Sequence, residues 1–211
     1  MSGDRAPTSH ERAAGRPWDE SYQDGRAPWD IDRPQPAFAE LAAEGGFRGA
    51  VLDAGCGTGE NALHVAGLGL SVRGFDIAET AVAQAIEKAR TRGLGAEFTV
   101  DDALRLSTVE GPFDTVLDCG LFHTLDAAER QRYAASLASV TEAGATLHIL
   151  CFRDAGEGSG PHPVARADLD AALWQGNGWV IKTVRDNRII ARFAPDGLPA
   201  WLVTAERFTA S

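Results

Sequence analysis

The chain has 211 residues, and its 30 acidic against 20 basic side chains give a formal net charge of −10 at pH 7. This length fits one domain with a sizeable core, and the acidic balance argues against a protein that binds the phosphate backbone of nucleic acids, because such proteins carry basic patches. The three cysteines lack C-x-x-C spacing, so we expect no metal site. There is no apolar signal segment and no run of about eighteen apolar residues, so we expect a cytoplasmic protein without a membrane span.

Two different segments precede the first predicted strand. Residues 1–16 are polar, interrupted by proline and glycine, and lack a hydrophobic period, so we expect them to be disordered. Residues 17–36, called the lid segment below, concentrate Trp18, Tyr22 and Trp29 in a stretch too rich in proline for core secondary structure. A short helix and then an irregular loop are expected there. The aromatic side chains either attach the lid segment to the domain or cover a ligand pocket.

A glycine-rich loop follows the first predicted strand. The sequence is apolar from residue 50, then has Gly55, Gly57 and Gly59, and continues as helix-like sequence. Glycine permits positive φ and lets a ligand approach the main chain closely. A dinucleotide fingerprint would need its third glycine at the position of Glu60, and an acidic side chain at a helix start opposes a pyrophosphate. The loop therefore suits a cationic or zwitterionic ligand better than a dinucleotide.

The second predicted strand, residues 71–75, leads directly to Asp76. This residue lies 17 positions beyond Gly59, close to where doubly wound folds place the carboxylate that accepts hydrogen bonds from both ribose hydroxyls. Capping of the following helix is the alternative role for Asp76. That helix shows apolar residues at helical spacing and is expected to stop at Gly93, before a third strand at residues 96–100.

The fourth predicted strand, residues 113–118, brings His123 to its carboxyl end, where ligands bind in open parallel sheets. Three roles stay open for His123, which are a general base, a wall of the pocket and a packed structural histidine. His162 lies in the loop 153–163, which is rich in glycine, proline and charge and is the expected rim of the pocket.

The remaining elements complete the predicted fold. Asp126 and Glu129 have the spacing of a capping box that opens a helix, and residues 146–152 are apolar enough for a central strand. A short helix at residues 168–174 and two alternating strands at 180–184 and 201–205 follow. We therefore predict an α/β fold with a Rossmann-like, doubly wound, seven-stranded sheet whose last strand is antiparallel.

The pattern Asp53-x-Gly55-x-Gly57-x-Gly59, followed by Asp76, resembles that of the class I S-adenosylmethionine-dependent methyltransferases, and the resemblance extends over residues 18–207. It implies one methyltransferase domain at residues 17–211, S-adenosylmethionine as cofactor and S-adenosylhomocysteine as product. It also implies an acidic contact to the adenine amino group, for which Asp102 is preferred and Asp101 is the rival. Together with the resemblance of the lid segment described next, from which the three aromatic residues come, it implies as cofactor-binding residues Trp18, Tyr22, Trp29, Asp53, Gly55, Cys56, Gly57, Gly59, Asp76, Ile77, Asp102, Ala103 and Asp118.

The lid segment carries a second resemblance. The pattern Trp18-Asp19, Tyr22, Gly25, Pro28-Trp29-Asp30 is similar to that of the plant halide/thiol methyltransferases and, more loosely, of the thiopurine methyltransferases. It implies a lid and a small-molecule acceptor with a thiol, a hydroxyl or a ring nitrogen. A protein methyltransferase and a non-catalytic cofactor-binding subunit stay open as alternatives, as do a monomer and a homodimer. The predicted acceptor pocket contains Trp29, Phe122, His123, Phe152 and His162.

Overall fold

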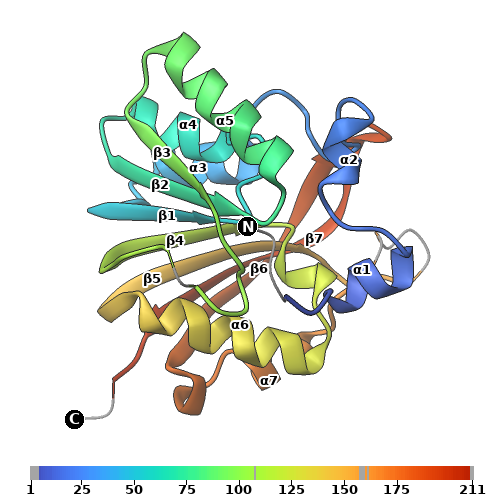
Figure 1. Ribbon diagram of the computed structural model, residues 1–211. Coiled ribbons are helices and arrows are strands. Elements are labelled where there is room, and N and C mark those ends of the chain that lie inside the picture. Colours follow the sequence, from blue (N-terminus) through green and yellow to red (C-terminus); the bar gives the residue numbers. More distant parts are fainter. Residues whose placement is uncertain (1–4, 107, 157–159, 161, 210–211) are drawn as a thin grey trace.

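The computed structural model describes residues 5–106, 108–156, 160 and 162–209 (Figure 1). The strands are β1 (Ala50–Ala54), β2 (Ser71–Asp76), β3 (Ala96–Val100), β4 (Phe113–Cys119), β5 (Thr141–Phe152), β6 (Trp179–Ala191) and β7 (Ala194–Arg207). The helices are α1 (Ser9–Ala14), α2 (Glu20–Gln23), α3 (Pro36–Ala43), α4 (Glu60–Gly67), α5 (Glu79–Arg92), α6 (Ala127–Ser139) and α7 (Arg166–Ala172), with 3-10 turns η1 (Phe122–Thr124) and η2 (Gln175–Asn177).

The strands form one seven-stranded sheet in the order β3-β2-β1-β4-β5-β7-β6. Neighbouring strands among β1 to β5 pair in parallel, whereas β7 is antiparallel to both β5 and β6. The direction of winding changes between β1 and β4, and open sheets of this kind bind ligands beyond the carboxyl ends of their strands at that point. The predicted doubly wound fold is confirmed.

Helices cover both faces of this sheet (Figure 1). On one face α3, α4 and α5 pack through residues such as Phe38, Leu63 and Val82, and on the other face α6 and α7 pack through Tyr133 and Leu169. The central strands β1 and β4 are buried along most of their length, which explains their nearly continuous apolar sequence. No helix in the described part of the chain is long and apolar enough to cross a membrane.

Three strands are longer than the sequence predicts. β5 begins at Thr141, and β6 and β7 form a hairpin of 13 and 14 residues, although hydrophobic alternation covers only a few positions of each. Residues 185–188 in β6 are mostly exposed at the edge of the sheet and pair with β7 through their backbone. Strand pairing of this kind needs no hydrophobic period, so sequence pattern alone shows only the buried part of the hairpin.

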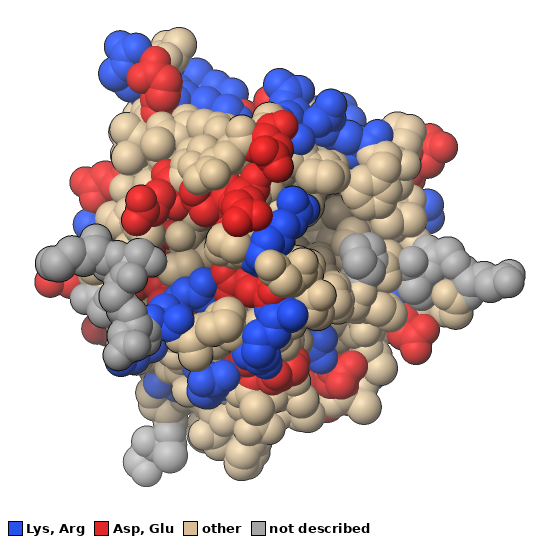
Figure 2. Space-filling view, turned by 45° about the vertical axis from the view of Figure 1, so that its right-hand side comes forward, with Lys and Arg blue, Asp and Glu red and all other residues tan. Residues whose placement is uncertain are grey.

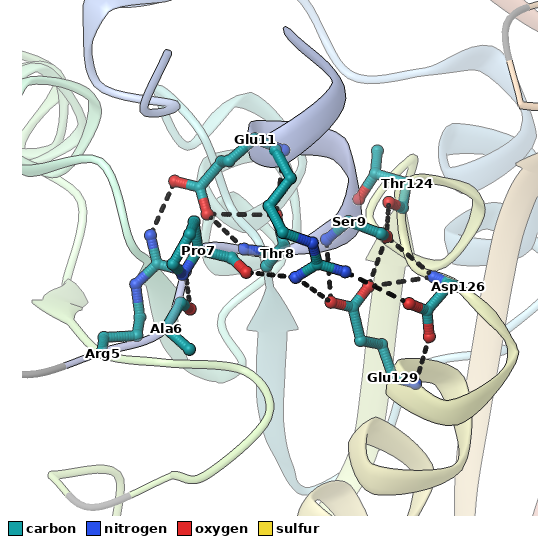
Figure 3. A network of polar contacts seen from close by, with 10 residues as sticks. Arg5, Ala6, Pro7, Thr8, Ser9, Glu11, Thr124, Asp126 and Glu129 are labelled. Carbon is teal, nitrogen blue, oxygen red and sulfur yellow. Dashed lines mark hydrogen bonds and ion pairs between the residues drawn. The ribbon is translucent and has the colours of Figure 1, made fainter. Parts of the chain in front are cut away.

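The prediction of a disordered tail is wrong for residues 5–16, while residues 1–4 lie outside the described part. α1 forms here because Thr8 and Glu11 make a capping box, and Arg5 pairs with Glu11 at 2.6 Å. The backbone N–H of Ser9 donates to Glu129 Oε1 at 2.8 Å and so attaches α1 to the start of α6 (Figure 3). Because Ser9 and Glu129 are 120 residues apart, no local pattern signals this contact.

The lid segment is attached to three parts of the domain. Asp19 accepts a hydrogen bond of 2.7 Å from a backbone N–H at the start of α5. Asp30 accepts one of 2.8 Å from the hydroxyl of Thr58, inside the glycine loop. The side-chain amide of Gln35 bonds both the N–H and the C=O of Ile190 in β6, at 3.0 and 2.8 Å. The lid segment is therefore bound to the glycine loop, to α5 and to the hairpin at once.

A network of charges supports this attachment. Lys88 Nζ lies 2.8 Å from Glu60, 2.7 Å from the hydroxyl of Thr58 and 3.8 Å from Asp30, and Arg92 pairs with Glu60 at 2.8 Å. On the face turned toward α1 and α2, acidic and basic side chains are mixed (Figure 2). The cations neutralise Glu60 and connect α5 to the lid segment through the glycine loop.

Candidate active site

A cavity of about 330 Å³ lies at the carboxyl ends of the parallel strands, between the glycine loop and the lid segment. Its walls come from the lid segment, from α1, from the turns after β1 to β5 and from the end of the β6–β7 hairpin. Thirteen of the seventeen predicted site residues border it, namely Trp18, Tyr22, Trp29, Gly55, Cys56, Gly57, Asp76, Ile77, Asp102, Ala103, His123, Phe152 and His162. The structure thus brings together residues from most of the chain.

The glycine loop has the conformation that the sequence predicts. Gly55, Gly57 and Gly59 all have positive φ, at 69°, 52° and 86°, a region that glycine adopts without the penalty of a side chain. Asp76 stabilises the loop because its Oδ2 accepts a hydrogen bond of 2.8 Å from the N–H of Gly57. Its Oδ1 accepts one of 2.9 Å from the N–H of Ala78, just ahead of α5. Asp76 therefore orders the loop and the start of α5 at the edge of the cavity.

Three predicted site residues lie behind the cavity wall. A side chain on Gly59 would come within 2.9 Å of Phe98, so this glycine allows close packing of the loop against β3. The carboxylate of Asp118 accepts hydrogen bonds from the hydroxyl of Tyr133 at 2.8 Å and from backbone N–H groups of the following turn. Phe122 is buried in the core. Asp118 and Phe122 are therefore better described as supports of the turn that carries His123 than as ligand contacts.

Asp53 also lies below the wall. It is fully buried, and its Oδ2 accepts a hydrogen bond of 3.0 Å from the N–H of Ala62 in α4. Its Oδ1 is buried and has no hydrogen-bond partner among the described residues. Burial, with smaller contributions from the charges of Asp118 and Asp76, raises the pKa of Asp53 to about 8. A buried acceptor without a partner fits a ligand that brings an ammonium group to this end of the glycine loop.

The raised pKa of Asp53 leads to a testable prediction for how the stability of the ligand-free protein depends on pH. A carboxyl group whose pKa is higher in the folded than in the unfolded state gives stability that is complete below the unfolded value, near 3.9, and is lost as pH rises through the folded value. The contribution of Asp53 to stability should therefore fall between about pH 4 and pH 8, while His123, with its pKa lowered to about 3, contributes in the opposite direction up to about pH 6.5. In thermal melts the stability of the parent relative to Asp53→Asn should therefore decrease across that range, and the stability of the variant should fall less steeply with pH. Asp118, whose burial raises its pKa to about 7, leaves a residual slope. An identical slope in the variant and the parent would contradict the assignment.

The two neighbouring aspartates after β3 have different surroundings. The Oδ2 of Asp101 accepts hydrogen bonds from the N–H and the hydroxyl of Thr108, at 2.7 and 2.8 Å, and from the N–H of Val109 at 3.2 Å. Asp101 therefore closes the loop that follows the strand. Asp102 is half-buried at the cavity and its Oδ1 accepts one hydrogen bond, from the N–H of Leu104 at 2.9 Å. Both aspartates border the cavity, and Asp101 is the one whose carboxylate also closes the loop after β3.

His123 lies at the inner end of the cavity, beside Phe152. Its ring is 4.5 Å from the ring of Phe152, and its Nδ1 accepts a hydrogen bond of 3.4 Å from the Phe152 N–H. Burial lowers the pKa of His123 to about 3, and the nearby His162 and Arg130 act in the same direction. The imidazole is therefore neutral at pH 7. With Nδ1 accepting from a backbone N–H, we assign the ring proton to Nε2.

Aromatic side chains of the lid segment line one side of the cavity. The indole N–H of Trp29 donates to the hydroxyl of Tyr22 at 3.0 Å, and the rings of Trp18 and Trp29 make an edge contact at 5.7 Å. The structure adds His10 of α1, which stacks on Trp18 at 4.1 Å and lies 3.1 Å from the Nε2 of His162 through its own Nδ1. The loop 153–163 was expected to form the rim of the pocket, and its His162 does border the cavity. Residues 157–159 and 161 of this loop lie outside the described part.

Some residues at the cavity have no signal in the sequence. His10 lies in a segment without hydrophobic period, and it reaches the cavity because α1 docks on α6. Ile189, Ala191 and Phe193 come from the end of the β6–β7 hairpin, whose length the sequence does not reveal. Within the described residues no group of three or more His, Cys, Asp or Glu side chains could hold a metal ion.

Comparison with known proteins gives a consistent family. A model of the "Methyltransferase domain" family matches residues 51–144. The chain is 34% identical over 170 residues to 2-heptyl-1-hydroxyquinolin-4(1H)-one methyltransferase of Mycobacteroides abscessus, covering 79% of this chain and 74% of that protein. It is 29% identical over 160 residues to probable thiol methyltransferase 2 of Arabidopsis thaliana, covering 74% and 70%.

The solved structures agree. One determined for the conversion of a disulfide bond into a thioacetal group during echinomycin biosynthesis is 36% identical, has a TM-score of 0.84, and covers 92% of this chain and 91% of its own. Methyltransferases with bound S-adenosylmethionine or S-adenosylhomocysteine are among the similar structures. The predicted resemblance to thiol methyltransferases is confirmed, and the positive-φ glycine loop, Asp76 and the unpartnered oxygen of Asp53 fit this cofactor. The chain therefore belongs to the class I S-adenosylmethionine-dependent methyltransferases and is a methyl-transferring enzyme that acts on a small molecule.

Proposed function

We propose that the enzyme methylates a thiol, a hydroxyl or a ring nitrogen of a small aromatic molecule, in the cavity beneath the lid segment. The observation that carries this proposal is that aromatic rings cover a cavity whose opposite wall is the glycine loop. The relatives named for a hydroxyquinolinone and for thiols support an aromatic or sulfur-containing acceptor. We further propose a single domain that includes α1 and acts as a monomer or homodimer.

In this proposal the cofactor lies along the glycine loop. When bound, S-adenosylmethionine supplies the methyl group on a positively charged sulfur. Asp76 accepts hydrogen bonds from the ribose hydroxyls, Asp102 accepts one from the adenine amino group, and Asp53, buried behind the cavity wall, attracts the ammonium group through its charge when it is ionised. Each of these side chains already has one oxygen, or both, oriented by a backbone N–H, so little ordering is needed on binding.

The lid segment has two roles in the proposed reaction. The faces of aromatic rings attract a cation, so Trp18, Tyr22 and Trp29 favour the sulfonium over water as a neighbour. Methyl transfer is an in-line displacement, and most of its acceleration comes from holding nucleophile and methyl in line at about 3 to 3.5 Å. The attachment of the lid segment to the glycine loop through Asp30 and Thr58 holds the acceptor against the cofactor.

We propose that His123 holds the nucleophile as a hydrogen-bond donor. A base with a pKa near 3 is poorly matched to a phenol or thiol, whose protons leave near pH 8.5 to 10. A neutral ring with its proton on Nε2 can instead donate to the oxygen or sulfur of an acceptor that has already lost its proton. The acceptor would then enter as its anion, or its proton would pass to water.

This role predicts a particular pH dependence. His123→Leu should lower kcat/KM by about ten-fold to a hundred-fold, and His123→Asn, which keeps a donor, should lower it less. In both variants the acid limb of the pH profile should stay at the pKa of the acceptor and move when a more acidic acceptor is used. An acid limb that stays in place with every acceptor and is absent from the leucine variant would show that His123 is the base.

Mass spectrometry of candidate acceptors tests the proposed function. The full chain is incubated with S-adenosylmethionine and, separately, with benzenethiol, 1-hydroxyquinolin-4(1H)-one and a peptide mixture. We expect one added methyl group on the thiol or on the hydroxyquinolinone. Methyl groups found only on peptides would favour a protein methyltransferase. Tight cofactor binding without transfer to any acceptor would favour a non-catalytic subunit.

A further inference from the structure

The mouth of the cavity carries large apolar side chains that the proposed reaction does not use. Phe193 at the turn of the β6–β7 hairpin is 60% exposed and Trp29 of the lid segment is 41% exposed, and both border the cavity. Side chains of this size that are held open at a cavity mouth mark a binding surface for apolar groups. Their exposure also means that the core of the domain does not depend on Phe193.

The two sides of this mouth are fixed to each other. The N–H of Arg192 donates to the C=O of Pro28 at 2.9 Å, and its guanidinium donates to the C=O of Arg26 at 3.0 Å. Trp29 and Phe193 are the residues that directly follow this backbone contact. The indole of Trp29 is also held by the hydroxyl of Tyr22. The indole of Trp29 and the backbone that carries Phe193 are therefore positioned before any ligand arrives.

The hairpin continues the apolar surface into the cavity. Residues Ile189 and Ala191 alternate along β6 and both border the cavity, as expected for side chains two positions apart on one face of a strand. Between them, Ile190 is bound through its backbone to Gln35, which fixes the register of this strand end against the lid segment. The apolar surface thus runs from the interior at Ile189 to the exposed ring of Phe193.

Taking the proposed function as given, we propose that the acceptor carries an apolar chain next to its nucleophilic ring, and that this chain leaves the cavity between Trp29 and Phe193. The hairpin end then determines which acceptors are used. Each methylene that is buried on binding contributes about 0.8 kcal/mol, or about a four-fold gain in affinity. A chain of several carbons lying against these residues would give a large preference over the bare ring, and the gain would appear in KM because the chain does not react.

Two pairs of acceptors test this inference. The first pair is 2-heptyl-1-hydroxyquinolin-4(1H)-one with 1-hydroxyquinolin-4(1H)-one, and the second is 4-heptylbenzenethiol with benzenethiol. The ratio of kcat/KM between the heptyl and the bare compound is measured for the parent, for Phe193→Ser and for Phe208→Ser. Phe208 is a matched control, because it is a phenylalanine with 37% exposure that does not border this cavity.

We expect the parent to prefer the heptyl compound, and Phe193→Ser to reduce that preference by about ten-fold or more through KM, with the Phe208 variant unchanged. The inference would be overturned if the parent showed no preference for the heptyl compound, or if Phe193→Ser left the ratio of kcat/KM unchanged. The proposed function would still stand in both cases, because the compounds would have been methylated. Failure of the parent to methylate any of the four compounds would instead count against the proposed function, and the inference would fall with it.

Discussion

Asp76→Asn is expected to raise the dissociation constant for S-adenosylhomocysteine by about ten-fold or more. The two carboxylate oxygens accept from backbone N–H groups of Gly57 and Ala78, and they are also the proposed acceptors for the ribose hydroxyls. An amide has one acceptor oxygen, so its NH₂ group must face a donor on the loop or on the ribose. Each lost or opposed hydrogen bond to a charged group costs about 1.5–3 kcal/mol. Isothermal calorimetry measures the change.

Glu79→Gln is the matched control for that measurement. Glu79 is exposed three residues further along, in the first turn of α5, so it tests the loss of a negative charge near the site without the loss of a contact. We expect its affinity to stay within about two-fold of the parent. Equal affinities for Asp76→Asn and the parent would mean that Asp76 only orders the glycine loop, and a large loss for Glu79→Gln would move the ribose contact to that residue.

Trp29→Ala is expected to lower kcat/KM for methyl transfer by about ten-fold or more. The indole borders the cavity, makes an edge contact with the ring of Trp18 and donates a hydrogen bond to Tyr22. In the proposed site its removal would admit water and take away a ring face near the sulfonium. The melting temperature should stay within a few degrees of the parent, because the side chain is already 41% exposed. Steady-state kinetics and a thermal melt check both statements.

Trp174→Ala provides the comparison for this variant. Trp174 is 54% exposed and does not border the cavity, so the same change there should leave kcat/KM unaltered. If Trp29→Ala turned over as fast as the Trp174 variant, the lid segment would be only an attachment of the N-terminus. The substrate class inferred from the thiol methyltransferase resemblance would then lose its structural support.

The sequence predicts the parallel strands well. β3 is found at the predicted residues 96–100, and β1, β2 and β4 lie within a residue or two of their predictions. β1 and β4 are buried along most of their length and leave nearly continuous apolar runs, whereas β3 is a short edge strand in which only Phe98 is buried. The exposed edge of β6 leaves no such run. For α1 the local signal is the capping box of Thr8 and Glu11, which stands in a polar segment without hydrophobic period, and the contact with Glu129 that attaches the helix joins distant parts of the chain.

The site residues likewise divide into those whose role the sequence predicts and those whose role depends on tertiary structure. Glycines and aspartates such as Gly57 and Asp76 are predictable, because backbone conformation and hydrogen bonding require those residue types at fixed spacing. The role of Asp118 is not, because its place in a pattern does not show that Tyr133 occupies its carboxylate. The low pKa of His123 arises from burial, and the hairpin contribution of Phe193 arises from tertiary pairing. Neither property is visible in local sequence.

A crystal structure of the full chain with S-adenosylhomocysteine is the most direct test of the central claim, which is that cofactor and acceptor share the cavity beneath the lid segment. We expect the ribose hydroxyls within hydrogen-bonding distance of Asp76, the adenine amino group at Asp102, and the sulfur facing the space bounded by Trp29 and His123. S-adenosylhomocysteine bound outside this cavity, or bound with its sulfur turned away from that space, would contradict the account.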